Sequence, residues 1–199
     1  GADIGTAFFL DPTYAWLVGA VSSGTNAAPS PMIFSSRDGG AHWSSRALAI
    51  VSSGLGIQAV YLTFIDPEHG WLVVDAGSHG GSSVANLYRT ADGGATWTTG
   101  TAPQSATVIF TDQDNGVSSG GPAGHGLFST HDGGRTWQPQ RLPVPDSFRG
   151  AVPGRATFVN PTDAVLPADL FDANSLPAGI GIYVTRDRGQ SWNLAAHRA

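Results

Sequence analysis

Short apolar runs alternate along the chain with clusters of Gly, Pro, Asp, Ser and Thr. Apolar runs of about four to eight residues, bounded by such turn-forming residues, are typical of β-strands. The segment 64–74 is an example, because apolar residues on both sides of Asp66-Pro-Glu-His-Gly70 predict a strand, a tight turn and a second strand. The pattern predicts an all-β protein.

One phrase recurs four times. A Ser or Thr is followed two residues later by Asp, a Gly comes two residues after the Asp, and a Trp ends the phrase. The four closing tryptophans are separated by 54, 40 and 55 residues, about 50 on average, which lies in the range of propeller blades. The copies occupy residues 36–43, 90–97, 130–137 and 185–192.

A second repeated element precedes the first. A Phe is followed two residues later by Asp or Asn, in the pairs Phe9/Asp11, Phe64/Asp66, Phe110/Asp112 and Phe158/Asn160. Together the two elements predict four strands per repeat, A to D, with the recurring Asp in the C–D turn. We therefore predict a β-propeller of four-stranded antiparallel blades, four of them in residues 1–199, as a single domain or segment. The expected blades are roughly 5–46, 58–100, 106–140 and 155–195.

The repeated turn has a structural logic. The Gly two places after the Asp is present in every copy, whereas Arg188 replaces the Gly one place after it in the fourth copy. We therefore predict that only the second position demands a positive φ. The Asp carboxylate can accept hydrogen bonds from its own turn, and the Trp supplies apolar area. We predict a structural role for these residues: Asp38, Gly40, Trp43, Asp92, Gly94, Trp97, Asp132, Gly134, Trp137, Asp187, Gly189 and Trp192.

The phrase Ser/Thr-x-Asp-x-Gly-x-Thr/Ser-Trp resembles the Asp-box, or bacterial neuraminidase repeat (BNR), of sialidase-like β-propellers. The chain looks most similar to exported bacterial proteins with BNR-like repeats and to photosystem II assembly factor-like propellers. His42 and Arg188 depart from the usual pattern. The resemblance implies that the box is structural and lies away from the binding face.

Composition excludes several classes of function. A formal net charge of −5 provides no electrostatic footprint for nucleic acid. No apolar run is long enough for a membrane span, and no basic amphipathic stretch suggests a membrane surface. Without cysteine or lysine, the chain has no thiol chemistry, P-loop or Schiff base. We expect no cofactor and no metal, and an extracellular or periplasmic protein whose leader is not seen.

Binding residues are expected on the long B–C and D–A loops, because variable loops on a rigid scaffold carry function. These loops include residues 167–181 as a B–C loop and 139–155 as a D–A loop. The sequence predicts a binding or scaffolding module for a protein, peptide or glycan. Its candidate rim residues are His79, His125, Arg149, Arg155, Asp169 and Asp172.

The alternative is a glycan-cleaving propeller, sialidase-like or xyloglucanase-like, which would use paired rim aspartates among Asp75, Asp169 and Asp172. An Arg-Ile-Pro signature of sialidases is absent, and the single glutamate, Glu68, falls in an A–B turn. Gly116-Val-Ser-Ser-Gly120 matches a nucleophile string, but a strand rather than a strand–turn–helix is expected there. The chain is therefore more simply interpreted as a non-enzyme.

The number of blades raises a further question. Three arrangements are open: a segment of a larger propeller, a ring completed by another copy or another chain, and a closed ring of four blades. An open ring would expose apolar blade faces, which natural proteins cover.

Overall fold

The computed structural model describes residues 2–21, 30–49, 60–79, 82–103, 107–120 and 126–198. Within these ranges every regular element is a β-strand, and the strands form four antiparallel sheets, which confirms the predicted fold class. The chain divides into two compact units, Gly1–Ala102 and Pro103–Ala199, with two sheets in each. No described segment is a helix long and apolar enough to cross a membrane.

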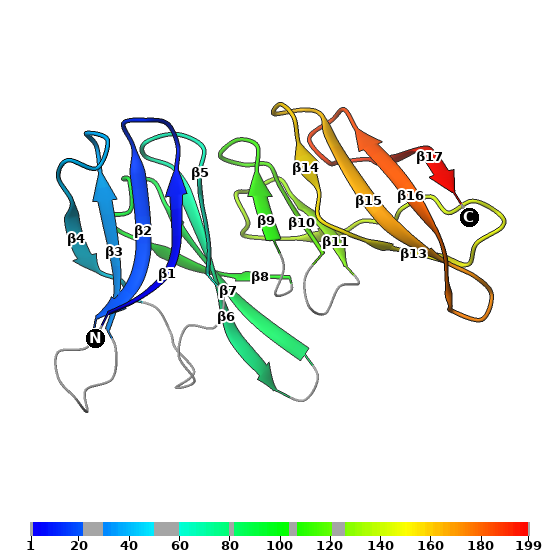
Figure 1. Ribbon diagram of the computed structural model, residues 1–199, viewed down its shortest axis with the longest axis horizontal. Helices are drawn as coiled ribbons and strands as arrows, with labels where there is room; N and C mark the ends of the chain where they lie inside the picture. The colour runs from blue at the N-terminus through cyan, green and yellow to red at the C-terminus, as the bar shows by residue number, and fades with distance from the viewer. Residues whose placement is uncertain are drawn as a thin grey trace. The chain divides into compact units, whose positions relative to one another are not determined.

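The first unit contains two meanders (Figure 1, blue to green). The first sheet has the order β1 (Ala2–Phe9), β2 (Ala15–Val21), β3 (Ser30–Ser36) and β4 (Ser44–Ala47). The second has the order β5 (Val60–Phe64), β6 (Gly70–His79), β7 (Ser82–Thr90) and β8 (Thr98–Ala102). In such a meander the A–B and C–D turns lie at one end of the sheet, here called the turn rim, and the B–C connection lies at the other end, the loop rim.

The second unit repeats this plan with one variation. The third sheet has the order β9 (Thr107–Phe110), β10 (Gly116–Ser119), β11 (Leu127–Thr130) and β12 (Gln138–Pro139). The fourth has the order β13 (Gly150–Pro153), β15 (Ala164–Phe171), β16 (Pro177–Thr185) and β17 (Asn193–Arg198). A short strand, β14 (Thr157–Phe158), also pairs with β15, so strand A of this sheet is broken in two.

The two turns of each sheet are tied together at the turn rim. In every copy, the residue after the repeated Asp donates its backbone N–H to a carbonyl of the A–B turn. The four bonds are Gly39 to Thr13 (2.9 Å), Gly93 to Glu68 (2.9 Å), Gly133 to Asp114 (2.9 Å) and Arg188 to Thr162 (3.0 Å). Because the bond uses only backbone atoms, Arg188 keeps it in the fourth copy. The prediction that only the second position of the turn demands a positive φ is wrong, because the first position also has a positive φ, and Arg188 adopts it at 64°.

Neighbouring sheets within a unit pack through equivalent positions. In the first unit, the buried Trp16 of β2 stacks on Phe64 of β5, and its indole N–H donates to Gly93 O at 2.9 Å. In the second unit, Val117 of β10 takes the place of Trp16 and packs so closely on Gly189 that a Cβ there would collide with it. Burial of these residues forms the core of each unit.

The fourth sheet corrects two expectations. Residues 167–181 were expected to be a B–C loop, but β15 and β16 extend to Phe171 and from Pro177, so the connection is only 172–176. Strand A was expected from residue 155, but it begins at Gly150. Pro167 suggested a loop because proline lacks the N–H that a central strand donates. The structure accommodates it because strand A leaves the ladder at residues 154–156, between β13 and β14.

Candidate functional site

One cavity of the second unit lies at the loop rim. Its volume is about 440 Å³. The lining comes from the start of β9, the end of β10, the β13–β14 break and the middle of β15, and consists of Thr107, Ser119, Gly120, Val152, Pro153, Gly154, Arg155, Pro167, Ala168, Asp169 and Ile180. Two predicted rim residues, Arg155 and Asp169, are therefore brought together.

A second cavity of about 340 Å³ adjoins the first and shares Val152 with it. It is lined by Arg149, Gly150, Ala151, Val152, Phe171, Asp172 and Ser175. We call the two cavities, which lie along β13 and β15 and share Val152, the rim groove. It contains four of the six predicted rim residues.

The break in strand A shapes the groove. Gly154 donates its N–H to Pro167 O at 2.8 Å, and Ala156 donates to Ser119 Oγ at 2.9 Å in a buried bond to the neighbouring sheet. A Cβ at Gly154 would lie 3.0 Å from Pro167 O, so only glycine fits easily. These two anchors hold the exposed Arg155 between them at the mouth of the groove.

Arg155 and Asp169 are both exposed and available to a ligand. Asp169 stands opposite Val152 in the β13–β15 ladder. It lies on the exposed face of β15, and the buried Leu166 and Ala168 lie on the other face. Within the described part of the chain, neither side chain has an ion pair. A guanidinium and a carboxylate in one cavity provide donors and acceptors for a polar ligand.

Asp172 and Arg149 have structural partners instead. Asp172 Oδ1 accepts the backbone N–H groups of Asn174 at 2.8 Å and Leu176 at 2.9 Å, which closes the β15–β16 turn. Arg149 donates from Nη1 to Ala173 O at 3.3 Å on the same turn. One oxygen of the Asp172 carboxylate is therefore occupied by the hairpin.

The other predicted rim residues are not placed in the groove. His125 lies outside the described residues. Asp75 and His79 belong to β6 in the first unit, in a stretch whose side chains are outside the description. Among the described residues, no group of three His, Cys, Asp or Glu side chains could hold a metal ion.

The repeated aspartates lie at the turn rim and are saturated with hydrogen bonds. Asp38 accepts from the backbone and ring of His42 and from the Ser36 hydroxyl, and these bonds lower its pKa from 3.8 to about 2. Burial raises the pKa of Asp132, but hydrogen bonds from Thr136 and Thr130 outweigh it and lower the pKa from 3.8 to about 2. Such carboxylates are poor proton donors at neutral pH.

Sequence reasoning missed the residues that the third sheet contributes. Ser119 and Gly120 belong to the string that resembles a nucleophile motif, yet Ser119 Oγ accepts a bond from Ala156 and supports the groove wall. Gly120 has a φ of 70° and packs against Gly154. Gly120 and Gly154 were the available sequence signal, because two backbone segments can approach this closely only where there is no side chain.

Comparison with solved structures places this geometry in a known fold. The GH74 xyloglucanase of Xanthomonas campestris is similar at 17% identity, over 94% of this chain and 29% of that chain, with a TM-score of 0.51. The GH74 enzyme of Niastella koreensis matches at 15% identity, over 96% of this chain and 30% of that chain, with a TM-score of 0.54. The α-L-arabinofuranosidase Arb93A of Fusarium graminearum matches at 14% identity, over 98% of this chain and 66% of that chain, with a TM-score of 0.50.

These likenesses show the fold alone: the sheets are blades of a β-propeller. The chain spans less than a third of the length of the two GH74 enzymes. No family model matches the sequence, and no curated protein matches it.

Proposed function

We propose that this protein is a non-catalytic β-propeller module that binds a glycan in the rim groove of the second unit. The observation that carries the proposal is that Arg155 and Asp169 line the same open cavity at the loop rim. Both side chains lack an ion-pair partner among the described residues, so a ligand does not have to displace an existing contact.

The chemistry of the groove suits a sugar. A guanidinium donates to adjacent hydroxyl oxygens through two parallel N–H groups, and a carboxylate accepts from hydroxyl groups. Phe171 and Val152 add apolar surface to the same groove, against which a sugar ring can pack. The structural neighbours are named for xyloglucan and arabinofuranoside chemistry, which makes their glycans the first ligands to test.

Hydrolysis is the second candidate, because the neighbours are glycoside hydrolases. It would require two carboxyl groups that cooperate across a bond. Each cavity of the groove contains a single carboxylate, Asp169 in one and Asp172 in the other. Two backbone N–H groups hold Asp172 Oδ1 in the β15–β16 turn, which gives this carboxylate a structural role. That structural role favours the binder.

Calorimetric titration with xyloglucan and arabinan oligosaccharides tests the proposal. We expect Arg155→Ala and Asp169→Asn each to weaken binding about tenfold, since each removes a charge-assisted hydrogen bond. Arg186→Ala and Asp114→Asn are matched controls, because both residues are exposed at the turn rim. Unchanged affinity in the two groove variants, or no binding of any oligosaccharide by the parent, would contradict the proposal.

A parallel assay separates binding from hydrolysis. The parent protein is incubated with each oligosaccharide, and new reducing ends are measured. We expect none. Release of reducing ends that is abolished in both Asp169→Asn and Asp172→Asn would establish the hydrolase instead.

A further inference from the structure

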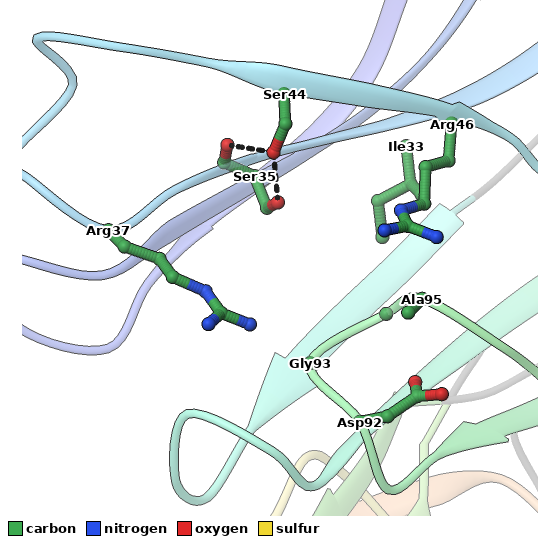
Figure 2. A pocket seen from close by; sticks show the side chains of 9 residues that line it. Ile33, Ser35, Arg37, Ser44, Arg46, Asp92, Gly93 and Ala95 are labelled. Carbon is green, nitrogen blue, oxygen red and sulfur yellow. Dashed lines mark hydrogen bonds between the residues drawn. The ribbon is translucent and has the colours of Figure 1, made fainter.

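The first unit contains a cavity of its own, unrelated to the rim groove. It has a volume of about 330 Å³ and lies between β3 and β4 of the first sheet and the C–D turn of the second (Figure 2). Its charged and hydroxyl side chains are Ser35, Arg37, Ser44, Arg46 and Asp92.

Strand register places the polar side chains on one face. Ile33 stands opposite Arg46, and Ser35 stands opposite Ser44, so these side chains share the face of the β3–β4 pair that meets the second sheet. Ile33 confirms that this face is directed toward the second sheet, because its Cδ1 lies 3.2 Å from the position that a Cβ on Gly94 would occupy. Arg37, two residues after Ser35, continues the same row.

Both arginines point toward the turn Asp92–Ala95 from different sides (Figure 2). Arg37 Nη2 lies 3.2 Å from the position that a Cβ on Gly93 would occupy, so glycine leaves the floor of the cavity open. Among the described residues, neither Arg37 nor Arg46 forms an ion pair. Two unpaired guanidinium groups thus converge on one space in a chain whose net charge is −5.

Asp92 lines the cavity but does not neutralise it. Its Oδ1 accepts from Thr96 N at 2.8 Å and Thr90 Oγ1 at 2.8 Å, and its Oδ2 accepts from Thr96 Oγ1 at 2.6 Å. Its carboxylate is therefore occupied within its own turn and is not within ion-pair distance of either arginine. With two arginines and one aspartate, the side chains that line the cavity have a net positive charge.

We propose that this cavity is a binding site for a tetrahedral oxyanion, a sulfate or phosphate group, free or esterified to a sugar. The planar guanidinium groups of Arg37 and Arg46 would each hold two anion oxygens, a geometry that such groups favour. Ser44 Oγ donates to Ser35 O at 3.3 Å, which leaves the Ser35 hydroxyl, 3.2 Å from Ser44 Oγ, to donate to the same anion. The proposal is independent of glycan binding in the rim groove.

Titration at constant ionic strength tests this site, with sodium chloride replaced stepwise by sodium sulfate or phosphate. Arginine Nε–H resonances report binding. We expect saturable shifts of two arginine signals with a dissociation constant of about 1 mM. Absence of saturable arginine shifts when sulfate or phosphate replaces chloride would overturn the proposal.

Variants make the assignment specific. Arg37→Met and Arg46→Met should each weaken sulfate binding about tenfold. Arg186→Met is the matched control, because Arg186 occupies the same position in the fourth repeat that Arg37 occupies in the first. Equal affinity in all three variants would overturn the proposal, and far-UV circular dichroism verifies that each variant is folded.

The source of the anion is distinguished by a third comparison. Glucose 6-sulfate that binds more tightly than inorganic sulfate identifies an ester ligand, and equal affinity identifies the free anion. Binding of neutral glucose at the same arginine signals, with the same affinity, would contradict an oxyanion site.

Discussion

Trp16 stacks face to face on Phe64, with ring centroids 3.7 Å apart and planes inclined by 7°. The same indole donates to the carbonyl of Gly93, in the C–D turn of the sheet that carries Phe64. One side chain thus joins strand B of one blade to strand A and the turn of the next. Trp16 is 2% exposed, so the contact lies within the core of the first unit.

We expect Trp16→Ala to destabilise the first unit by about 3–5 kcal/mol, because it removes a large buried ring and leaves a cavity. Trp16→Phe should cost less, since it keeps a ring against Phe64 but leaves Gly93 O without its donor. Unfolding in guanidinium chloride measures the stability of both variants. Trp43→Phe is the control, because Trp43 is 45% exposed and should change stability little. A loss as large in the control would show that the inter-blade stack is not the cause.

Substitution of Gly189 tests the equivalent contact in the second unit, between Gly189 and Val117. Gly189 has a φ of 81°, and a Cβ there would collide with Val117. Gly189→Ala should therefore be destabilising, both from backbone strain and from the clash. Adding Val117→Ala should recover part of the loss, because it removes the clash but not the strain. Strict additivity of the two substitutions in denaturant unfolding would contradict this.

Two substitutions of Arg188 distinguish the effect of backbone strain on stability from the effect of an ion pair. The φ of Arg188 is 64°, and its Nε lies 3.3 Å from Asp112 Oδ2 in the neighbouring sheet. Both substitutions, to Ala and to Gly, lose the half-exposed pair, which is worth about 0–1 kcal/mol. We expect the Gly variant to be more stable than the Ala variant by about 1 kcal/mol, because only Gly relieves the positive φ. Equal stabilities of the two variants in chemical denaturation would refute the strain.

The repeated aspartates predict acid sensitivity. Their folded-state pKa values lie below 3.8, at about 2 for Asp38 and Asp132. A depressed pKa contributes stability that is present above the unfolded pKa and is lost as pH falls through the folded pKa. The free energy of unfolding should therefore be constant near neutrality and fall between about pH 4 and pH 2. Asp132→Asn should flatten part of that fall.

Local sequence was sufficient to predict the blades. The recurring Ser/Thr, Asp and Gly bond to one another within a few residues, as in Thr130 to Asp132 at 2.9 Å and Gly134 N to Thr130 Oγ1 at 2.9 Å. Contacts of this range are encoded by spacing alone, so the strand order and the four sheets could be predicted before the structure.

The fourth blade shows where spacing was insufficient. Pro167 and Asp169 suggested a loop, yet both continue β15, where Pro167 is accommodated because strand A breaks opposite it. That break depends on Gly154 bonding to Pro167 and on Ala156 bonding to Ser119, which is 37 residues away. A strand that is stabilised by such a distant partner has no local signature.

The sequence by itself determined the repeat, the turn chemistry and the end of the blades at which Arg155 and Asp169 were expected. Only the tertiary structure decided that these two side chains share a cavity, that Asp172 closes a turn, and that Arg37 and Arg46 face the next blade's turn. The physical reason is range: hydrogen bonds within a turn follow from neighbouring residues, whereas a binding cavity depends on how one packed sheet meets another.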